Sequence, residues 1–389
     1  MELTEGEIDA VRALRRDLHR HPELSFEEVR TTKVLREHLE QIPGLTVLDL
    51  PVRTGLVCTI GGTGTGPEVA LREDCDALPQ TEDVDVPWKS ENKGVMHACG
   101  HDLHSAALFG AAMALSRNRT CFSKVDLIFQ PAEEVTRGAA YLMDEGHLFD
   151  AIHPAFLFGF HNWPTIPAGT VAVKTGCLMA AKKNLTITVH GRGGHGSEPQ
   201  NNVDPIVCAA AMIEGLQTIV SRNTDPMDNV VLSVNAIRGG SEKNLVVDDV
   251  VFLMTIRALQ ERAMERAFER TKALLLGIAA AYECTVRLKI EDEVPAVVNP
   301  ERMTDLAKKI AEKVPDTKVS SCEGVLASED FSMYRKAVPS SWFFFVGSRP
   351  EDRPCGALHS GTFDPDEKAM IDGANLLLSA AATCGEKEA

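Results

Sequence analysis

The sequence predicts an α/β protein of two domains, in which a smaller α+β domain is inserted into a larger one. Three observations lead to this fold class. The chain has 389 residues, more than one ordinary hydrophobic core accommodates. Helical patterns alternate with apolar, buried strands over residues 1–178 and 291–389, which indicates a central sheet covered by helices. Residues 179–290 instead follow the order β-α-β-β-α-β, the ferredoxin-like order.

The elements of the larger domain follow from periodicity and turn signals. Residues 5–40 predict two helices, and Ser25 with Glu28 three positions later predicts a capping box for the second. Three strands separated by Gly/Pro turns come next: LTVLDL, GLVCTI and EVALRED. After residue 103 we expect a buried helix, a strand running into QPAEE, a helix at AAYLMDEGHL and a strand at AFLFGFHNWP that ends near His161.

The inserted domain and the return of the chain complete the pattern. Amphipathic helices are predicted over 203–222, with Pro205 in the first turn, and over 260–282. The strands around them are KNLTITVHG, NVVLSVNAIRGG, LVVDDVVFLMTIRAL and CTVRLKIED. The larger domain then resumes with the helix ERMTDLAKKIAEKV, the buried strand SSWFFFVGS and a closing helix, DEKAMIDGANLLLSAAAT.

Composition excludes several classes of partner. The formal net charge is −16 and the pI is near 5.2, so we expect no binding to nucleic acid or to an anionic membrane surface. No run of 18 apolar residues predicts a membrane span, and the first residues lack the pattern of a signal peptide. The ten cysteines are scattered without a C-x-x-C pair, which is typical of reduced thiols. We therefore expect a cytoplasmic protein.

The stretch MHACGHDLHSAALFGAA concentrates candidate metal ligands. Cys99 and His101 lie two positions apart just before a helix, and a loop can aim both side chains at one point. A thiolate and an imidazole are good ligands for Zn²⁺ or a similar transition metal. The alternative is a buried cysteine beside histidines that only cap a helix, and the stretch alone does not decide between the two.

Other candidates stand where α/β proteins keep their sites, after the carboxyl ends of strands. Each residue alone also suits a solvated loop. Adjacent carboxylates repel unless a cation or a shared proton holds them, and a metal permits one to ligate while the other accepts a proton from water. The candidates are Asp74 and Asp76 after VALRE, the pair Glu133 and Glu134, His161, and His359 after WFFFVG.

The inserted domain offers a second set of polar residues. GRGGHG (191–196) is not a dinucleotide motif, because no helix follows directly and no ribose-binding acid stands at the right distance. His195 is either a surface turn residue or a hydrogen-bond donor that reaches the site when this domain closes. Four further polar residues lie near strand ends of this domain. Binding a substrate carboxylate and forming a structural salt bridge are equally good interpretations of each: Asn235, Arg238, Asn244 and Arg257.

Taken in order, eight motifs resemble those of the M20 metallopeptidase superfamily, and more narrowly its amidohydrolase branch. That branch includes hippurate hydrolases, N-acyl-amino-acid amidohydrolases, auxin-conjugate hydrolases and N-acetyl-diaminopimelate deacetylases. The resemblance covers nearly the whole chain and is specific for the family but not for the substrate. The motifs are LRRDLHRHPELSFEE, LREDCDALPQTE, MHACGHDLHSAALFGAA, FQPAEE, GFHNWP, GRGGHGSEPQ, SEDFSMY and LHSGTFD.

The resemblance implies a zinc-peptidase-like catalytic domain with a dinuclear metal centre, and a lid that commonly mediates dimerisation. Glu133 would be the general base and His195 the lid histidine, acting within one chain or across a dimer. Asn235, Asn244 and Arg257 would bind substrate. The metal ligands would be Cys99, His101, Glu134, His161 and His359, supported from behind by Asp74, Asp76, Asp102 and His104. The two divalent ions would be Mn²⁺ or Zn²⁺, with Co²⁺ or Ni²⁺ as alternatives.

The sequence departs from the family pattern without losing any proposed ligand. Glu73 and Cys75 stand where Ala and Met are usual, and Gly196-Ser197 stands where Ala-Ala or Ala-Ser is common. In the lid, Val247 and Met254 replace the usual Pro and Gly. We expect these changes to affect the edge of the site and the shape of the lid.

The predicted function is metal-dependent hydrolysis of the amide bond of N-acylated amino acids, by a homodimer or possible tetramer joined through the lid. The alternatives in the same class are a carboxypeptidase or dipeptidase acting on small peptides and an N-acetyl-diaminopimelate deacetylase. A non-catalytic binding protein would have lost a ligand or the base, and none is lost. A structural zinc protein remains the last alternative.

Overall fold

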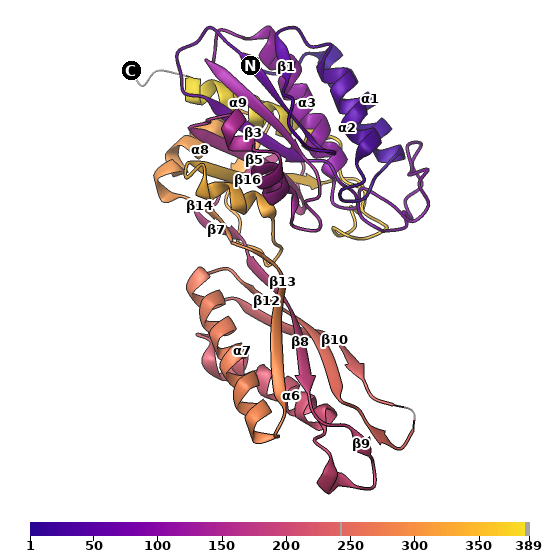
Figure 1. Ribbon diagram of the computed structural model, residues 1–389. Coiled ribbons are helices and arrows are strands. Elements are labelled where there is room, and N and C mark those ends of the chain that lie inside the picture. The colour runs from indigo at the N-terminus through magenta and orange to yellow at the C-terminus, as the bar shows by residue number, and fades with distance from the viewer. Residues whose placement is uncertain (242, 386–389) are drawn as a thin grey trace. The chain divides into compact units, whose positions relative to one another are not determined.

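The computed structural model describes residues 1–241 and 243–385, which divide into two compact units (Figure 1). Unit 1 comprises Met1–Gly176, Val298–Glu323 and Met333–Ala389, and unit 2 comprises Cys177–Val297 and Gly324–Ser332. The segment Gly324–Ser332 lies outside the range 179–290 expected for the inserted domain. Main-chain hydrogen bonds hold it to the start of unit 2, since Ala180 N donates to the carbonyl oxygens of Val325 and Ala327.

Unit 1 is built on a mixed eight-stranded sheet with the order β1-β2-β4-β3-β5-β16-β6-β15. Its centre is parallel, because β4, β3, β5 and β16 run the same way. Strands β3, β4 and β16 are almost wholly buried, and β5 is buried over residues 157–162, which matches their apolar sequences. The strands are β1 (Leu45–Val47), β2 (Leu56–Gly61), β3 (Val69–Asp74), β4 (Lys124–Gln130), β5 (Phe156–Pro167), β6 (Thr170–Ala172), β15 (Lys318–Ser320) and β16 (Ser341–Arg349).

Helices α3 and α9 pack on the central strands β3 and β5, while α1 contacts α3 and α8 contacts α9. One continuous apolar core joins α1, α3 and α9 to the sheet, and α3 is buried over most of its length. This burial explains why α3 is apolar almost all round. The helices are α1 (Glu5–Arg20), α2 (Val29–Leu39), α3 (His101–Arg117), α8 (Thr304–Glu312) and α9 (Lys368–Gly385), with 3₁₀ turns at Glu301–Met303 and Asp330–Lys336.

Three local predictions in unit 1 are wrong. Ser25 does not cap α2, because its hydroxyl donates to Asp76 Oδ2 and the N-cap residue, Glu28, makes no side-chain cap. β5 continues to Pro167 instead of ending at His161, because pairing with β16 extends to that residue. The expected helix at AAYLMDEGHL is broken at His147, whose φ of +50° is left-handed. It consists of α4 (Gly138–Ala140), a π-helical turn (Tyr141–Glu145) and α5 (Leu148–Ala151).

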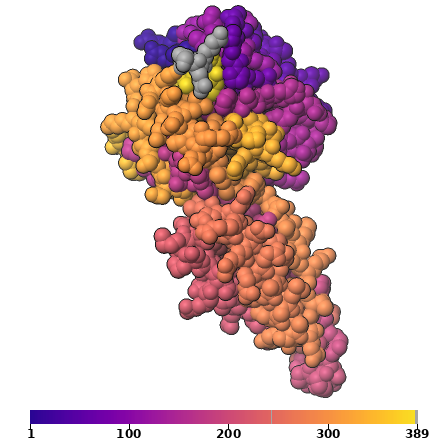
Figure 2. Space-filling model, turned by 90° about the vertical axis from the view of Figure 1, so that its left-hand side faces the viewer, coloured from indigo at the N-terminus to yellow at the C-terminus, as the bar shows by residue number. Residues whose placement is uncertain are grey.

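Unit 2 has the predicted order of strands and helices. Its antiparallel sheet runs β10-β12-β8-β13, and alternate residues of β12 are buried beneath α6 and α7. Side chains of α7 form part of the surface of unit 2 that faces the viewer in Figure 2. Leu276 of this helix is exposed. The elements are β7 (Gly176–Met179), β8 (Ala181–His190), β9 (Gly194–His195), a 3₁₀ turn (Pro199–Asn201), α6 (Pro205–Asn223), β10 (Val230–Gly239), β11 (Leu245–Val246), β12 (Asp249–Ala258), α7 (Glu261–Ala281) and β13 (Thr285–Val294), with β14 (Val297–Asn299) pairing with β7.

Two further findings concern the part of the chain that the structure describes. All ten cysteines are free thiols. No helix within residues 1–241 and 243–385 is both long enough and apolar enough to cross a membrane.

Candidate metal centre

The sequence-predicted ligands come together in unit 1. Ligand atoms of Cys99, His101 and His161 lie within 4.8 Å of one another, as do those of Cys99, Glu134 and His359 and those of His101, Glu133 and Glu134. They come from the loop before α3, the first residue of α3, the loop after β4, the middle of β5 and the loop before α9. Residues up to 260 positions apart in sequence (99 to 359) therefore converge on one place.

Hydrogen bonds orient the two buried histidines. His101 Nδ1 lies 3.2 Å from Asp76 Oδ1, and His161 Nδ1 lies 2.6 Å from the carbonyl oxygen of Asn162. Both oxygens only accept, so each Nδ1 carries the proton and donates it. In its neutral form each ring therefore offers an unprotonated Nε2, which is the usual arrangement for a metal-binding histidine with a carboxylate or carbonyl behind it.

The donor atoms of the cluster fit a metal ion. His101 Nε2 and Glu134 Oε1 are buried without a hydrogen-bond partner, which is costly unless another group satisfies them. Cys99 Sγ lies 3.4 Å from His161 Nε2, and His359 Nε2 lies 3.4 Å from Glu134 Oε2. Sulfur, imidazole nitrogen and carboxylate oxygen around one point form a donor set suited to Zn²⁺, Mn²⁺ and their neighbours.

The electrostatics of the cluster also favour a cation. Burial opposes a charge on His101, yet the carboxylates of Asp74, Asp76 and Glu134 outweigh it and raise its pKa to about 10. Burial raises the pKa of Glu134 to about 7, and the charge of Asp76 adds to that shift while His101 opposes it. The buried donors thus carry an excess of negative charge, which divalent ions would neutralise.

Asp76 connects the HACGHD and PAEE motifs. Its carboxylate accepts from Glu133 N at 3.1 Å and from Glu134 N at 3.0 Å, besides the contacts with His101 and Ser25. Burial opposes the charged form, but these donors outweigh it and lower the pKa of Asp76. The ionised carboxylate therefore holds the loop of Glu133 and Glu134 against the histidine beside it.

Asp74 and His104 form a second buried pair behind the cluster. His104 Nδ1 donates to Asp74 Oδ1 at 2.7 Å, and His104 Nε2 accepts from Asn162 N at 3.0 Å. Because both ring nitrogens of His104 bind protein groups, His104 is better suited to supporting the site than to binding a metal ion.

Asn162 was not predicted as a site residue from the sequence, although it follows His161 in GFHNWP. Its Nδ2 also donates to the Cys99 carbonyl at 2.7 Å, so it holds the cysteine loop.

Gly100 makes the tight loop between Cys99 and His101 possible. It is the N-cap of α3 with φ +88°, and a Cβ there would lie 2.3 Å from Asn162 Nδ2. Across the site, His359 also has a left-handed φ of +61°, and its backbone N donates to the Ala98 carbonyl at 2.9 Å. That bond brings the two loops side by side.

Asp102 contacts α1 rather than the cluster. Its Oδ2 lies 2.8 Å from both Arg15 Nε and His19 Nδ1, while His19 Nε2 lies 3.2 Å from Glu82 Oε1. This buried network fastens the start of α3 to the N-terminal helix. His97 is also fully buried, with both ring nitrogens lacking a hydrogen-bond partner. Burial lowers its pKa to about 4, and the structure gives it no further explanation.

The two departures beside Asp74 have structural explanations. Glu73 Oε1 accepts from Phe160 N at 3.0 Å, just beyond the last paired residues of β3 and β5. The buried carboxylate thus replaces a missing ladder partner for β5. Cys75 Sγ donates to the carbonyl oxygen of Gln130 at 3.2 Å, and burial raises the pKa of its thiol. It is a structural thiol and not a further thiolate.

In unit 2, the proposed lid residues occupy different surroundings. His195 is exposed in the turn at β9, and Asn244 contacts the same turn, since its carbonyl accepts from Gly196 N at 3.2 Å. Asn235 is exposed at the bulge of β10, and Arg238 is exposed further along that strand. Arg257 Nη1 donates to Leu326 O at 3.0 Å and to Ser328 Oγ at 2.8 Å, so part of its guanidinium serves the fold.

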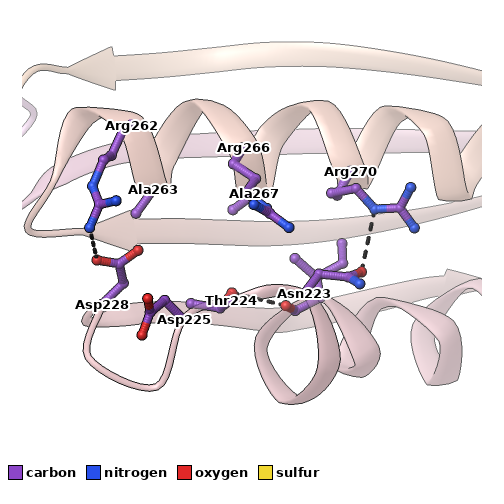
Figure 3. Close-up of a pocket in the computed structure, with 10 residues that line it drawn as sticks. Asn223, Thr224, Asp225, Asp228, Arg262, Ala263, Arg266, Ala267 and Arg270 are labelled. Carbon is purple, nitrogen blue, oxygen red and sulfur yellow. Dashed lines mark hydrogen bonds and ion pairs between the residues drawn. The ribbon is translucent and has the colours of Figure 1, made fainter.

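Unit 2 also contains a small cavity of about 210 Å³ between the end of α6 and the start of α7, which none of the candidate residues lines (Figure 3). Arg262, Arg266 and Arg270 follow one another along α7 at this cavity. Arg262 pairs with Asp228 at 2.8 Å and Arg270 Nε donates to Asn223 Oδ1 at 3.3 Å. These contacts hold the end of α6 and the loop after it against α7.

A mixed α/β fold that gathers this donor set beside an adjacent carboxylate is the arrangement of a metal-dependent hydrolase. Residues 70–383 match the model of peptidase family M20/M25/M40, and the chain belongs to this family.

Similar proteins extend over nearly the whole chain. It is 37% identical to an N-acetylcysteine deacetylase of Bacillus subtilis over 92% of either chain. It is 36% identical to thermostable carboxypeptidase 1 of Saccharolobus solfataricus, covering 94% of this chain and 93% of that one. Among solved structures, the Bacillus subtilis YXEP protein, described as a dinuclear metal binding peptidase from the M20 family, matches with a TM-score of 0.83 and 32% identity, covering 97% and 98%.

Proposed function

We propose that the chain hydrolyses the amide bond of N-acylated amino acids, releasing a carboxylic acid and a free amino acid. The observation that carries this proposal is the convergence of two buried atoms that make no hydrogen bond, His101 Nε2 and Glu134 Oε1, beside a second carboxylate, Glu133. The similarity to an N-acetylcysteine deacetylase supports the substrate class.

Five residues would hold two divalent ions: Cys99, His101, Glu134, His161 and His359. Mn²⁺ or Zn²⁺ suits the mixed sulfur, nitrogen and oxygen donors, with Co²⁺ or Ni²⁺ as alternatives. When bound, such ions acidify water and polarise a carbonyl group. Asp76 fixes the ring of His101 for this task, and Asp74 fixes His104, which in turn contacts Asn162.

Glu133 is the proposed general base. It takes a proton from the attacking water as the new C–O bond forms at the amide carbon. It then delivers that proton to the amine nitrogen as the C–N bond breaks, so that protons balance. Unit 2 would act as a lid, and His195 Nε2–H would donate to the oxygen of the tetrahedral intermediate. Asn235, Asn244 and Arg257 are the proposed contacts for the substrate carboxylate.

The second candidate function is hydrolysis of small peptides, which the similarity to a carboxypeptidase favours. N-acetyl-diaminopimelate is a further candidate substrate. The same residues would carry all three reactions, because each breaks an amide bond next to a free carboxylate. A panel of N-acetyl and N-benzoyl amino acids, N-acetyl-diaminopimelate and dipeptides, assayed with metal-loaded enzyme, separates them.

Neighbouring glutamates provide a matched test of the centre. Glu133→Gln should lower kcat by a factor of about 10² to 10⁴ while the protein retains its metal, because only the proton acceptor is lost. Glu134→Gln should lose metal as well as activity. Activity assays paired with elemental analysis of both variants check this. Full activity in Glu133→Gln would exclude its role as base.

We also propose a homodimer, or a tetramer, associated through unit 2, in a reducing cytoplasmic environment. Strands β10 and β13 form the two edges of the unit 2 sheet, with exposed Ile237 and Ile290. The ten free thiols are consistent with a reducing compartment. Sedimentation velocity of wild type and of Ile290→Lys tests the association.

A further inference from the structure

The turn that carries His195 contains an interaction that the proposed mechanism does not use. Strand β9 pairs with β11, placing His195 opposite Leu245. Two positions after His195, Ser197 turns back onto its ring. Ser197 N lies 3.2 Å from His195 Nδ1, and Ser197 Oγ lies 2.7 Å from the same atom.

The chemistry of these two groups decides which ring nitrogen carries the proton. A backbone N–H can only donate, so Nδ1 of His195 accepts as long as the ring keeps this position, which the shorter contact with Ser197 Oγ holds. The Ser197 hydroxyl then also donates to Nδ1, since that nitrogen has no proton to give. In a neutral imidazole the proton must therefore lie on Nε2, on the opposite side of the ring from Ser197.

We propose that Ser197 is a positioning residue that holds His195 in its Nε2–H tautomer, ready to donate a hydrogen bond. The proposal rests on the function proposed above, in which His195 stabilises an oxyanion. The opposite tautomer would present a lone pair at Nε2, which would repel that oxygen. Ser197 thereby acts through His195 rather than on the substrate itself.

The backbone of the turn is held separately from the ring. Asn202 Nδ2 donates to the His195 carbonyl at 2.9 Å, and Gly196 N donates to the Asn244 carbonyl. A Cβ at position 196 would lie 2.4 Å from Asn244 Oδ1, so glycine leaves room for that side chain. This accounts for the departure at Gly196 in GGHGSEP. Gly196 admits Asn244, and Ser197 supplies a hydroxyl that alanine lacks.

Substitutions at Ser197 test the proposal. Ser197→Ala removes the hydroxyl donor and leaves the weaker backbone donor. We expect a rise in the Nδ1–H tautomer of His195 and a loss of about tenfold in kcat, with KM nearly unchanged. Ser197→Thr retains the hydroxyl and should restore both. Ser221→Ala is the matched control, because its hydroxyl donates to Gln217 O on α6 and has no contact with His195.

The tautomer is read directly from ¹⁵N–¹H correlation spectra of protein labelled at its histidines. The signals of His195 are assigned by their absence from the spectrum of His195→Gln. The spectra are recorded over a pH series, so that the ¹⁵N shifts themselves identify the neutral form of the ring. A protonated Nδ1 in the wild type would overturn the proposal, as would an unchanged spectrum or unchanged kcat in Ser197→Ala. If the wild type hydrolyses no N-acyl amino acid, the proposed function fails, whereas the spectrum still decides the tautomer.

Discussion

At the residue scale, single hydrogen bonds decide what each polar group can do. His101 and His161 use Nδ1 to bind an oxygen and keep Nε2 for a ligand, whereas His104 uses both nitrogens inside the protein. Three histidines of similar burial thus have different chemistry, because their neighbours differ. Asn162 is central to this arrangement, since it contacts both His104 and the loop of Cys99.

A substitution at Gly100 would disturb this arrangement directly, because the glycine lies against the Asn162 side chain. Gly100→Ala places a Cβ against Asn162 Nδ2 and strains a left-handed φ, so we expect a loss of at least tenfold in metal affinity along with lower stability. Gly94→Ala is the control, because Gly94 has φ +78° but nothing within 4 Å of its Cβ. It should cost only about 1 kcal/mol and leave metal affinity unchanged. Equal metal affinity in both variants would contradict the role given to Asn162. Metal titration and thermal unfolding measure the two effects.

At the element scale, β4 carries an acid in a place where strands are apolar. Asp126 is fully buried in this central strand, between Glu68 and Lys124. Burial raises its pKa to about 7, and the hydrogen bond and charge of Glu68 add to this, while Lys124 opposes it. The folded protein thus binds a proton at Asp126 that the unfolded chain releases near pH 4.

This proton makes stability depend on pH. Because the folded pKa is raised, the contribution is complete below about pH 4 and is lost as pH rises through about 7. Asp126→Asn should therefore reduce the fall in unfolding free energy between pH 5 and pH 8, by on the order of 1 kcal/mol. Urea unfolding followed by tryptophan fluorescence measures this. Asp49→Asn, at an exposed position, should leave the pH dependence as in the wild type. If Asp126→Asn also leaves it unchanged, the raised pKa is wrong.

At the scale of the whole molecule, the candidate metal ligands and the tryptophans are confined to one of the two units. The candidate ligands all lie in unit 1, where they bring buried negative charge together. All three tryptophans, Trp88, Trp163 and Trp342, also lie in unit 1, so their fluorescence reports on that unit alone.

Removing metal should therefore destabilise unit 1 selectively. Chelation should lower the midpoint of the tryptophan-detected thermal transition, and added Mn²⁺ or Zn²⁺ should restore it. At free metal a hundredfold above Kd, the expected stabilisation is about 2.7 kcal/mol. Glu133→Gln should keep this response, whereas Glu134→Gln should lose most of it. A midpoint that is the same with and without metal would contradict the proposed centre.

Much of the fold was determined by the sequence alone. Apolar strands and helical periodicity predicted the central strands of unit 1 and the β-α-β-β-α-β order of unit 2, because burial on a sheet or a helix leaves a regular pattern. The left-handed φ of Gly100 agrees with its residue type, since only glycine adopts this conformation freely. The motifs predicted which residue types come together at the candidate site, because a motif consists of particular residue types at a fixed spacing within one short segment.

Only the tertiary structure decided which polar groups bind one another. Ser25 resembles a helix cap but donates to Asp76, and Asp102 stands in the HACGHD motif but binds Arg15 and His19 of another helix. Glu73 completes the hydrogen bonding of β5, and Ser197 sets the tautomer of His195. A buried polar group must find a partner, and that partner is whatever the packing brings within about 3 Å, at any separation along the chain. Local pattern therefore determines the elements, whereas packing determines the hydrogen bonds that orient the candidate site.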